Sequence, residues 1–252
     1  MTSTTVRKAL EKAGAVVFWL VVWQLAAMAA NRTLLLPIPT PLDTLSALWR
    51  MGGTAVFWRS LLLSLLRICA GFVLALAVGA LCAAASVRWR GFRWLTAPLL
   101  GLVRAVPVAV FTVLVFLWVS RPYIPSTIVF LTVLPIVWSS VEAGLGSVDP
   151  HLAELGRVFG MSGWWIARHI TLPQLRPYLT SAVATGLGFA WKSGIAAEVI
   201  CRTQGSLGDL LWSGKATVSY DEVFALTVVI VLCSALLQGA AAKATERGRN
   251  RA

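Results

Sequence analysis

Charged side chains are scarce in this sequence. Asp, Glu, Lys and Arg make up 13% of its 252 residues, whereas 58% of the residues are hydrophobic. A soluble domain rarely exceeds about half apolar residues, and so few charges leave too little polar surface for a soluble protein of this size. The composition therefore predicts an integral membrane protein.

Acidic residues are scarcer still, at 10 against 22 Lys and Arg, which gives a net charge of +12. A charge of this sign suggests nucleic acid as a partner. We exclude that function because the basic residues lie between apolar runs and at the two ends of the chain, as membrane topology requires.

Side chains suited to catalysis or metal binding are few. The four cysteines are scattered without a spacing that suits a metal site or a disulfide framework, and the two histidines, His151 and His169, lie in one loop. The sequence has no Gly-rich phosphate-binding loop with its Lys and Ser/Thr, and no Ser-His-Asp or paired-carboxylate arrangement stands out. We therefore expect no catalytic site, no metal and no cofactor in this chain.

Six apolar segments are long enough to cross a bilayer, which takes about 20 residues of helix. They cover residues 13–30, 61–87, 94–119, 124–145, 178–200 and 223–242. The first has the position of a signal peptide, but no clear small-residue cleavage site precedes Asn31 and Arg32, so we expect it to be retained. The predicted fold class is an all-α polytopic membrane protein with about six transmembrane helices.

The distribution of Lys and Arg predicts how these segments are oriented. With the N-terminus inside, 13 of these residues lie on the inner side and 6 on the outer side, while Arg67, Arg104 and Lys192 fall within segments. Cytoplasmic loops carry the excess of positive charge. We therefore expect both termini, and the loop between the fourth and fifth segments, to be cytoplasmic.

The connector after the first segment contains a candidate amphipathic helix at residues 42–50, preceded by the cap sequence Thr-Pro-Leu-Asp at 40–43. Two interpretations stay open. The helix lies on the membrane surface or docks there, or the segment is a simple connector.

The loop at 149–173 has the pattern of two short helices. Asp149 can cap free helix N–H groups, and Pro150 suits the first helical position. Apolar residues then recur on one helical face, at Leu152, Leu155 and Phe159. Gly160 is expected to end this helix and Ser162 to cap the second. Leu172-Pro173 is expected to end the second helix, because proline disfavours helix in the residue before it.

The spacing within this loop resembles the EAA loop of permease subunits of bacterial ABC importers. That pattern reads Glu-Ala-Ala, three residues, Gly, nine residues, Ile, one residue, Leu-Pro. The chain keeps five of these residues, namely Glu154, Gly160, Ile170, Leu172 and Pro173. It departs at the two alanines, which are Leu155 and Gly156 here, and we expect Gly156 to loosen the first helix.

Further residues, between about 59 and 239, resemble the nitrate/sulfonate/taurine branch of these permeases. They are Ser60 to Arg67, Gly71-Phe72, Arg104 to Pro107, Trp191-Lys192, Ala197-Glu198 and Gly205 to Gly208. The resemblance implies the type I ABC importer transmembrane domain. It divides the chain into an N-terminal region at 1–58, with the first transmembrane helix and an outer connector, a permease core at 59–242 and a basic cytoplasmic tail at 243–252.

The resemblance also implies a function. The chain would form the pathway through the bacterial inner membrane for a small solute, an organic anion such as a sulfonate, taurine or nitrate. Its implied partners are cytosolic ABC ATPase subunits, an extracytoplasmic binding protein and a second permease copy. Two alternatives stay open: an integral membrane lipid-modifying enzyme, and an ion- or proton-coupled secondary transporter, a class with repeats and broken spans that we do not find in the sequence.

Because the chain has no ATP site of its own, the resemblance makes the loop the site of coupling to the ATPase. Its expected members are Leu152, Glu154, Leu155, Gly156, Phe159, Gly160, Ile170, Leu172 and Pro173. The apolar stripe would be buried against the ATPase, and Gly160 would allow a turn with no room for a side chain. Glu154 would meet a basic or amide partner or cap locally, or it is a solvated acid favoured by the helix dipole.

Charges within spans mark a candidate translocation pathway, formed by Arg104, Lys192 and Glu198. A charge at the bilayer centre costs roughly 2.5–3.5 kcal/mol on insertion scales, so each needs a partner or a pathway. Structural alternatives stay open for all three. Arg104 bonds to a carbonyl near Pro107, Lys192 snorkels or forms an ion pair, and Glu198 reaches water at the outer end.

Overall fold

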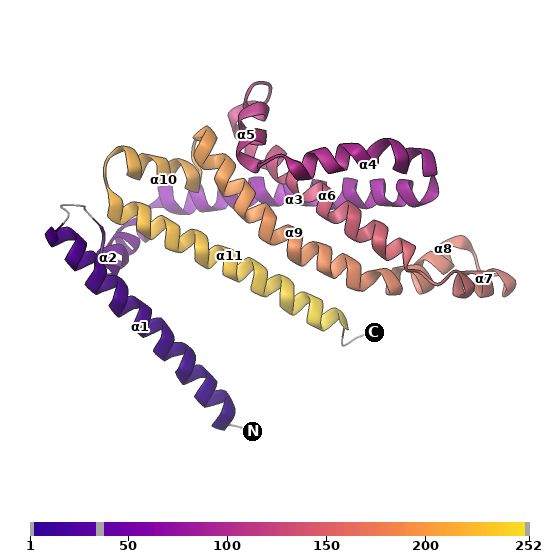
Figure 1. Ribbon diagram of the computed structural model, residues 1–252, viewed down its shortest axis with the longest axis horizontal. Helices are drawn as coiled ribbons and strands as arrows, with labels where there is room; N and C mark the ends of the chain where they lie inside the picture. The colour runs from indigo at the N-terminus through magenta and orange to yellow at the C-terminus, as the bar shows by residue number, and fades with distance from the viewer. Residues whose placement is uncertain (1–2, 34–37, 250–252) are drawn as a thin grey trace. The chain divides into compact units, whose positions relative to one another are not determined.

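The computed structural model describes residues 3–33 and 38–249, and every regular element within these ranges is a helix (Figure 1). The elements in chain order are α1 (Ser3–Thr33), α2 (Pro41–Gly52), α3 (Ala55–Arg88), α4 (Arg90–Ala105), α5 (Val108–Phe116), η1 (Arg121–Tyr123), α6 (Ile124–Gly146), α7 (Pro150–Val158), α8 (Gly163–Ile166), η2 (Ala167–Thr171), α9 (Leu172–Cys201), α10 (Leu207–Ala216) and α11 (Tyr220–Arg249). Of these, η1 is a 3-10 turn and η2 a π-helical turn.

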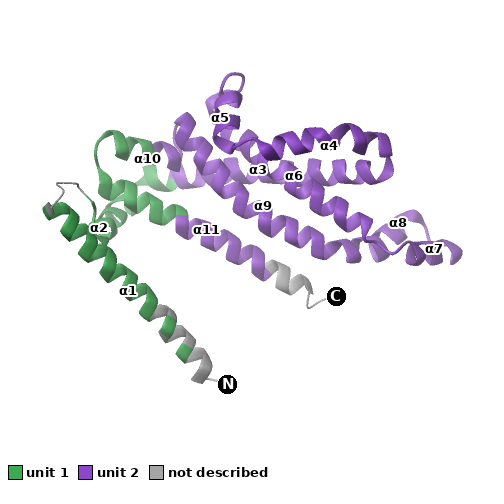
Figure 2. Ribbon diagram, viewed as in Figure 1, with its two compact units in different colours: residues 1–58, 210–230 green, residues 59–209, 231–252 purple. Residues whose placement is uncertain are grey.

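The chain forms two compact units (Figure 2). The first comprises residues 1–58 and 210–230, and the second comprises residues 59–209 and 231–252. The second unit contains the predicted loop and all three charges of the candidate pathway.

Helices α6 and α9 lie side by side at the centre of the second unit (Figure 1). Small residues of α9 make the packing close, since Ala182, Gly186 and Ala190 are all buried. A Cβ on Gly186 would lie only 3.2 Å from side chains of Phe72 in α3 and Val133 in α6. Small residues let membrane helices approach in this way, because lipid supplies no hydrophobic force between them.

Four helical stretches are long and apolar enough to cross a membrane, judged by length and composition among the described residues. They cover Gly14–Arg32, Ala55–Arg88, Arg121–Gly146 and Tyr220–Lys243. The bent pair α4 and α5 gives a fifth if it is one span. The predicted fifth segment forms the long helix α9, but its small and polar residues, with Lys192 and Glu198, keep it outside this set.

The third predicted segment is broken. Helix α4 ends at Ala105, α5 begins at Val108, and the two are bent by 102°. Pro107 lacks an N–H to continue the helix, and Val106 before it is extended, with φ −80° and ψ 125°. The prediction of one continuous span at 94–119, and with it the expectation that no span is broken, is wrong.

Candidate coupling loop and buried charges

The first helix of the loop begins and ends at the predicted residues. The Asp149 side chain accepts a hydrogen bond from the backbone N–H of His151 at 2.8 Å, and Pro150 follows in the first turn. Beyond the helix, Gly160 has a φ of +69°, in the left-handed region, and its N–H donates to the carbonyl of Arg157 at 3.0 Å. A Cβ on Gly160 would meet nothing within 4 Å. The turn therefore needs glycine for its backbone conformation, and the expectation that it has no room for a side chain is wrong.

Gly156 tightens the loop, contrary to the expectation that it loosens the first helix. It is buried, and a Cβ at this position would lie 3.1 Å from Cγ1 of Ile166 and 3.3 Å from Cδ1 of Ile170. The missing side chain lets α7 pack directly against α8 and η2. Ile170 of the predicted pattern thus helps to hold the two halves of the loop together.

The second half of the loop differs from the prediction at its end. Ser162 caps α8 as expected, accepting from the N–H of Trp165 at 3.3 Å. The helix does not stop at Leu172-Pro173, because the π-helical turn η2 leads directly into α9, which begins at Leu172. Pro173 has no N–H to donate, so it leaves a gap in the backbone hydrogen bonds where η2 meets α9.

A hydrogen bond closes the base of the loop. The backbone N–H of Asp149 donates to the side-chain oxygen of Gln174 at 3.1 Å, which joins the start of α7 to the start of α9. Figure 1 shows α7 and α8 at the end of α6 and α9. The loop therefore forms a compact structure attached to α6 and α9.

The loop presents an apolar surface. The predicted stripe of Leu152, Leu155 and Phe159 is exposed by 47%, 54% and 72%. The sequence reasoning missed three further exposed apolar residues, Val158, Trp164 and Trp165. These residues are exposed because α7 and α8 pack together through their other faces. No local sequence pattern shows which faces pack. Glu154 is exposed and makes no hydrogen bond or ion pair within the described part of the chain, so it is available to a partner or to solvent.

Glu198 does not reach water, since its exposed fraction is 0%. Its Oε2 accepts a hydrogen bond from the Ser64 hydroxyl of α3 at 2.7 Å and one from the N–H of Gly208 at 3.3 Å. The Ser64 oxygen in turn accepts from the N–H of Leu207 at 2.9 Å. The carboxylate therefore fastens the start of α10 to α3 and α9.

The contact around Glu198 also explains why the sequence has a glycine at 208 and an arginine at 67. A Cβ on Gly208 would lie 2.5 Å from the Cβ of Glu198, so the Gly-Ser-Leu-Gly segment at 205–208 needs its last glycine to reach α9. Arg67 lies near this carboxylate and donates to the carbonyl of Gln204 at 3.2 Å. Among the described residues, Oε1 of Glu198 and Nη1 of Arg67 are buried without hydrogen-bond partners.

The other two charges of the candidate pathway lie apart from this contact. Arg104 of α4 donates to the carbonyl oxygen of Pro135 in α6 at 2.9 Å, so its acceptor is on a neighbouring helix and not near Pro107 as expected. Lys192 is exposed on α9. The structure therefore does not gather Arg104, Lys192 and Glu198 into one site.

A helical membrane domain with a compact loop of this kind has known relatives. The family model for the binding-protein-dependent transport system inner membrane component matches residues 46–243. The chain belongs to this family. It is thus a permease subunit of an ABC importer and a multi-pass protein of the inner membrane, and neither alternative class, secondary transporter or lipid-modifying enzyme, is needed to explain it.

Two relatives in Escherichia coli strain K12 are similar over most of their length. This permease is 28% identical over 223 residues to the aliphatic sulfonates transport permease protein SsuC, covering 86% of this chain and 80% of SsuC. It is 27% identical over 222 residues to the taurine transport system permease protein TauC, with the same two coverages.

Solved structures agree on the fold. The permease matches a chain of a bacterial ABC transporter that imports the acidic polysaccharide alginate, with a TM-score of 0.62 at 16% identity over 96% of both chains. It matches an amino acid ABC transporter with a TM-score of 0.61 at 16% identity, over 78% of this chain and 94% of the other. The predicted fold class, the type I ABC importer transmembrane domain, is confirmed.

Proposed function

We propose that the loop at 149–173 couples this permease to a cytosolic ABC ATPase. The observation that carries the proposal is the exposed apolar surface of Leu152, Leu155 and Phe159 on a loop that Gly156 and two helix caps hold in one shape. A preformed apolar surface loses little conformational entropy on docking. Helix α9 continues directly from the loop, so a displacement of the loop moves the central pair of helices.

The orientation proposed with this function places both termini and the loop in the cytoplasm. The excess of 13 inner over 6 outer Lys and Arg supports it. Single cysteines at Ser162 and Gln204, both exposed, test it with an impermeant reagent in intact cells. The cysteine at Ser162 is expected to resist the reagent and that at Gln204 to react, and the reverse pattern would contradict the proposal.

The proposed cargo is a small organic anion of the sulfonate or taurine type, delivered by an extracytoplasmic binding protein to a homodimer of this permease. The similarity to SsuC and TauC, which are named as permeases for aliphatic sulfonates and taurine, supports this choice of cargo. The alginate transporter related in fold was solved in complex with a periplasmic protein, which supports the binding-protein partner. Arg104, Lys192 and Glu198 stay candidates for the pathway, with the exposed cation of Lys192 the best suited to attract an anion.

Coupling is tested by two matched pairs of variants in the loop. Leu155→Glu places a charge in the apolar surface, whereas Leu155→Met keeps the surface apolar with a similar volume. Burying a leucine side chain contributes about 1.5–3 kcal/mol, so Leu155→Glu should weaken binding of the ATPase by roughly 10- to 100-fold. Glu154→Lys, compared with Glu154→Gln, separates a partner-facing acid from a solvated one.

The measurements are co-purification with the partner ATPase and ATP-driven uptake in vesicles. Leu155→Glu is expected to lose both while the permease stays inserted, and Leu155→Met to keep both. Glu154→Lys is expected to abolish uptake if the acid meets a partner. Normal uptake by both Leu155→Glu and Glu154→Lys would remove the coupling assignment.

A further inference from the structure

Within the first unit, α2 is held near the end of α1 and the start of α11, two candidate membrane spans. Asn31, near the end of α1, donates to the carbonyl of Ile38 at 3.0 Å and accepts from its N–H at 2.8 Å. At the other end of α2, Arg50 forms a 2.6 Å ion pair with Asp221, in the first turn of α11. Because Asn31 and Asp221 lie at the ends of candidate spans, α2 lies at the level of a membrane boundary.

The conformation of α2 is fixed locally as well. A capping box at its start has the Thr40 side chain accepting from the N–H of Asp43 at 3.2 Å, while the Asp43 carboxylate accepts from the N–H of Thr40 at 2.9 Å. This arrangement satisfies donors that a helix start leaves free. The helix therefore presents a constant surface to its surroundings.

The outward surface of α2 is divided into two stripes. The apolar stripe consists of Leu42, Leu45 and Trp49, which are exposed by 69%, 62% and 86%. The polar stripe consists of Asp43, Ser46 and Arg50, also exposed and offset from the first by one residue, about 100° around the helix. The opposite face is buried through Thr44 and Ala47.

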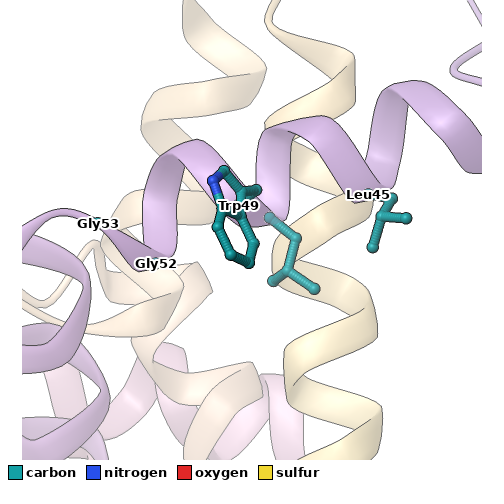
Figure 3. Close-up of a pocket in the computed structure, with 5 residues that line it drawn as sticks. Leu45, Trp49, Gly52 and Gly53 are labelled. Atoms are coloured by element: carbon teal, nitrogen blue, oxygen red, sulfur yellow. The ribbon is translucent and has the colours of Figure 1, made fainter.

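An apolar groove extends the apolar stripe toward the end of α2 (Figure 3). Leu45 and Trp49 project from the same side of the helix, and Leu48 completes the side chains of the groove. Gly52 and Gly53 line the rest without side chains, and a Cβ on Gly52 would meet nothing within 4 Å.

We propose that α2 is an interfacial helix that inserts Leu42, Leu45 and Trp49 into lipid at this membrane boundary. Asp43, Ser46 and Arg50 then face water. Amphipathic helices bind in this way with their apolar face at the headgroup–acyl boundary, where tryptophan is favoured. The occupant is lipid for two reasons. The indole N–H of Trp23 in α1, a helix with many exposed apolar side chains, donates to the carbonyl of Pro39 at 3.2 Å, next to the start of α2. An apolar and a polar stripe side by side at the level of the span ends also fit a boundary between lipid and water.

The proposal holds for either orientation of the chain, so it stands independently of the coupling function. The test uses single cysteines at Leu45, Trp49 and, as the matched control, Ser46. The native cysteines are replaced, each variant carries an environment-sensitive fluorophore, and the full permease–ATPase complex is reconstituted into phospholipid vesicles. Quenching is measured with brominated phospholipid and, separately, with iodide in the water.

Labels at 45 and 49 are expected to lose fluorescence with brominated lipid and to be protected from iodide, whereas the label at 46 shows the opposite order. Equal iodide quenching at all three positions would overturn the proposal in favour of a simple connector. Protection of 45 and 49 from both quenchers would overturn it in favour of a protein cover, either the binding protein or a second permease copy. Leu42→Cys samples the same stripe if Trp49→Cys does not assemble.

Discussion

The turn at Gly160 gives a quantitative test of how the loop is built. A Cβ there would meet nothing within 4 Å, so steric contact inside the subunit contributes no penalty to a substitution. The φ of +69° does contribute one, because an L-residue in the left-handed region costs roughly 1–2 kcal/mol. Asparagine visits this region more readily than alanine, since its side chain can hydrogen-bond locally. Gly160→Ala should therefore destabilise the loop more than Gly160→Asn, although asparagine is larger.

A loss of 1–2 kcal/mol corresponds to roughly a 5- to 30-fold lower ratio of ordered to disordered loop. The assay compares wild-type, Gly160→Ala and Gly160→Asn permease for co-purification with the ATPase at limiting ATPase concentration and for ATP-driven uptake. Gly160→Ala is expected to be impaired in both, and Gly160→Asn to retain most of both. Membrane insertion of all three should be equal, because the turn lies outside the spans.

Wild-type behaviour of Gly160→Ala would refute this reasoning, because it would mean that the left-handed turn is not needed in the docked state. If Gly160→Ala is normal and only Gly160→Glu is inactive, the glycine matters through contact with the partner surface. The rank order of alanine, asparagine and glutamate therefore separates backbone conformation from interface sterics.

Three further outcomes are expected. Glu198→Ala leaves the Ser64 hydroxyl and the N–H of Gly208 buried without an acceptor, at a cost of about 1–3 kcal/mol per group. It should therefore lower the melting temperature of the purified complex more than Glu198→Gln does. Equal melting temperatures would contradict the role of Glu198 in fastening α10. Lys192→Ala should reduce uptake of an anionic sulfonate while yield and ATPase activity stay normal, and unchanged uptake would mean that the lysine only snorkels. Hydrogen bonds from Thr40, first from its backbone N–H and then from its hydroxyl, lower the pKa of Asp43 below its ordinary value of 3.8. The Asp43 carboxylate therefore stabilises α2 fully above the pKa that it has in the unfolded chain. This stabilisation is lost as the pH falls through the lower pKa of the folded state. Asp43→Asn should accordingly reduce stability at neutral pH, measured by thermal unfolding, and make little difference in strong acid.

Much of the fold followed from local signals in the sequence. The apolar runs marked the long helices, and Asp149, Gly160 and Ser162 marked the ends of the short ones, because capping and left-handed turns depend on a few neighbouring residues. The break in the third span was also readable, since Val106-Pro107 interrupts an apolar run where proline disfavours helix. The prediction of one continuous span at 94–119 gave more weight to the length of the apolar run than to Pro107.

Other features depended on residues far apart in the chain. Spacing alone placed Glu198 near water, whereas Ser64, 134 positions away, and the start of α10 enclose it completely. Gly156 looked like a weak point in a helix until Ile166 and Ile170 proved to fill the space above it. Arg104 found its acceptor on Pro135 because α4 and α6 lie together. The sequence by itself determined the membrane class, most of the long helices and the start and turn of the loop at 149–173, since hydropathy, caps and turns act over a few residues. Only the tertiary structure decided which charges are buried and which apolar faces stay exposed. Burial depends on packing between helices, and the residues that pack together can lie more than a hundred positions apart in the chain.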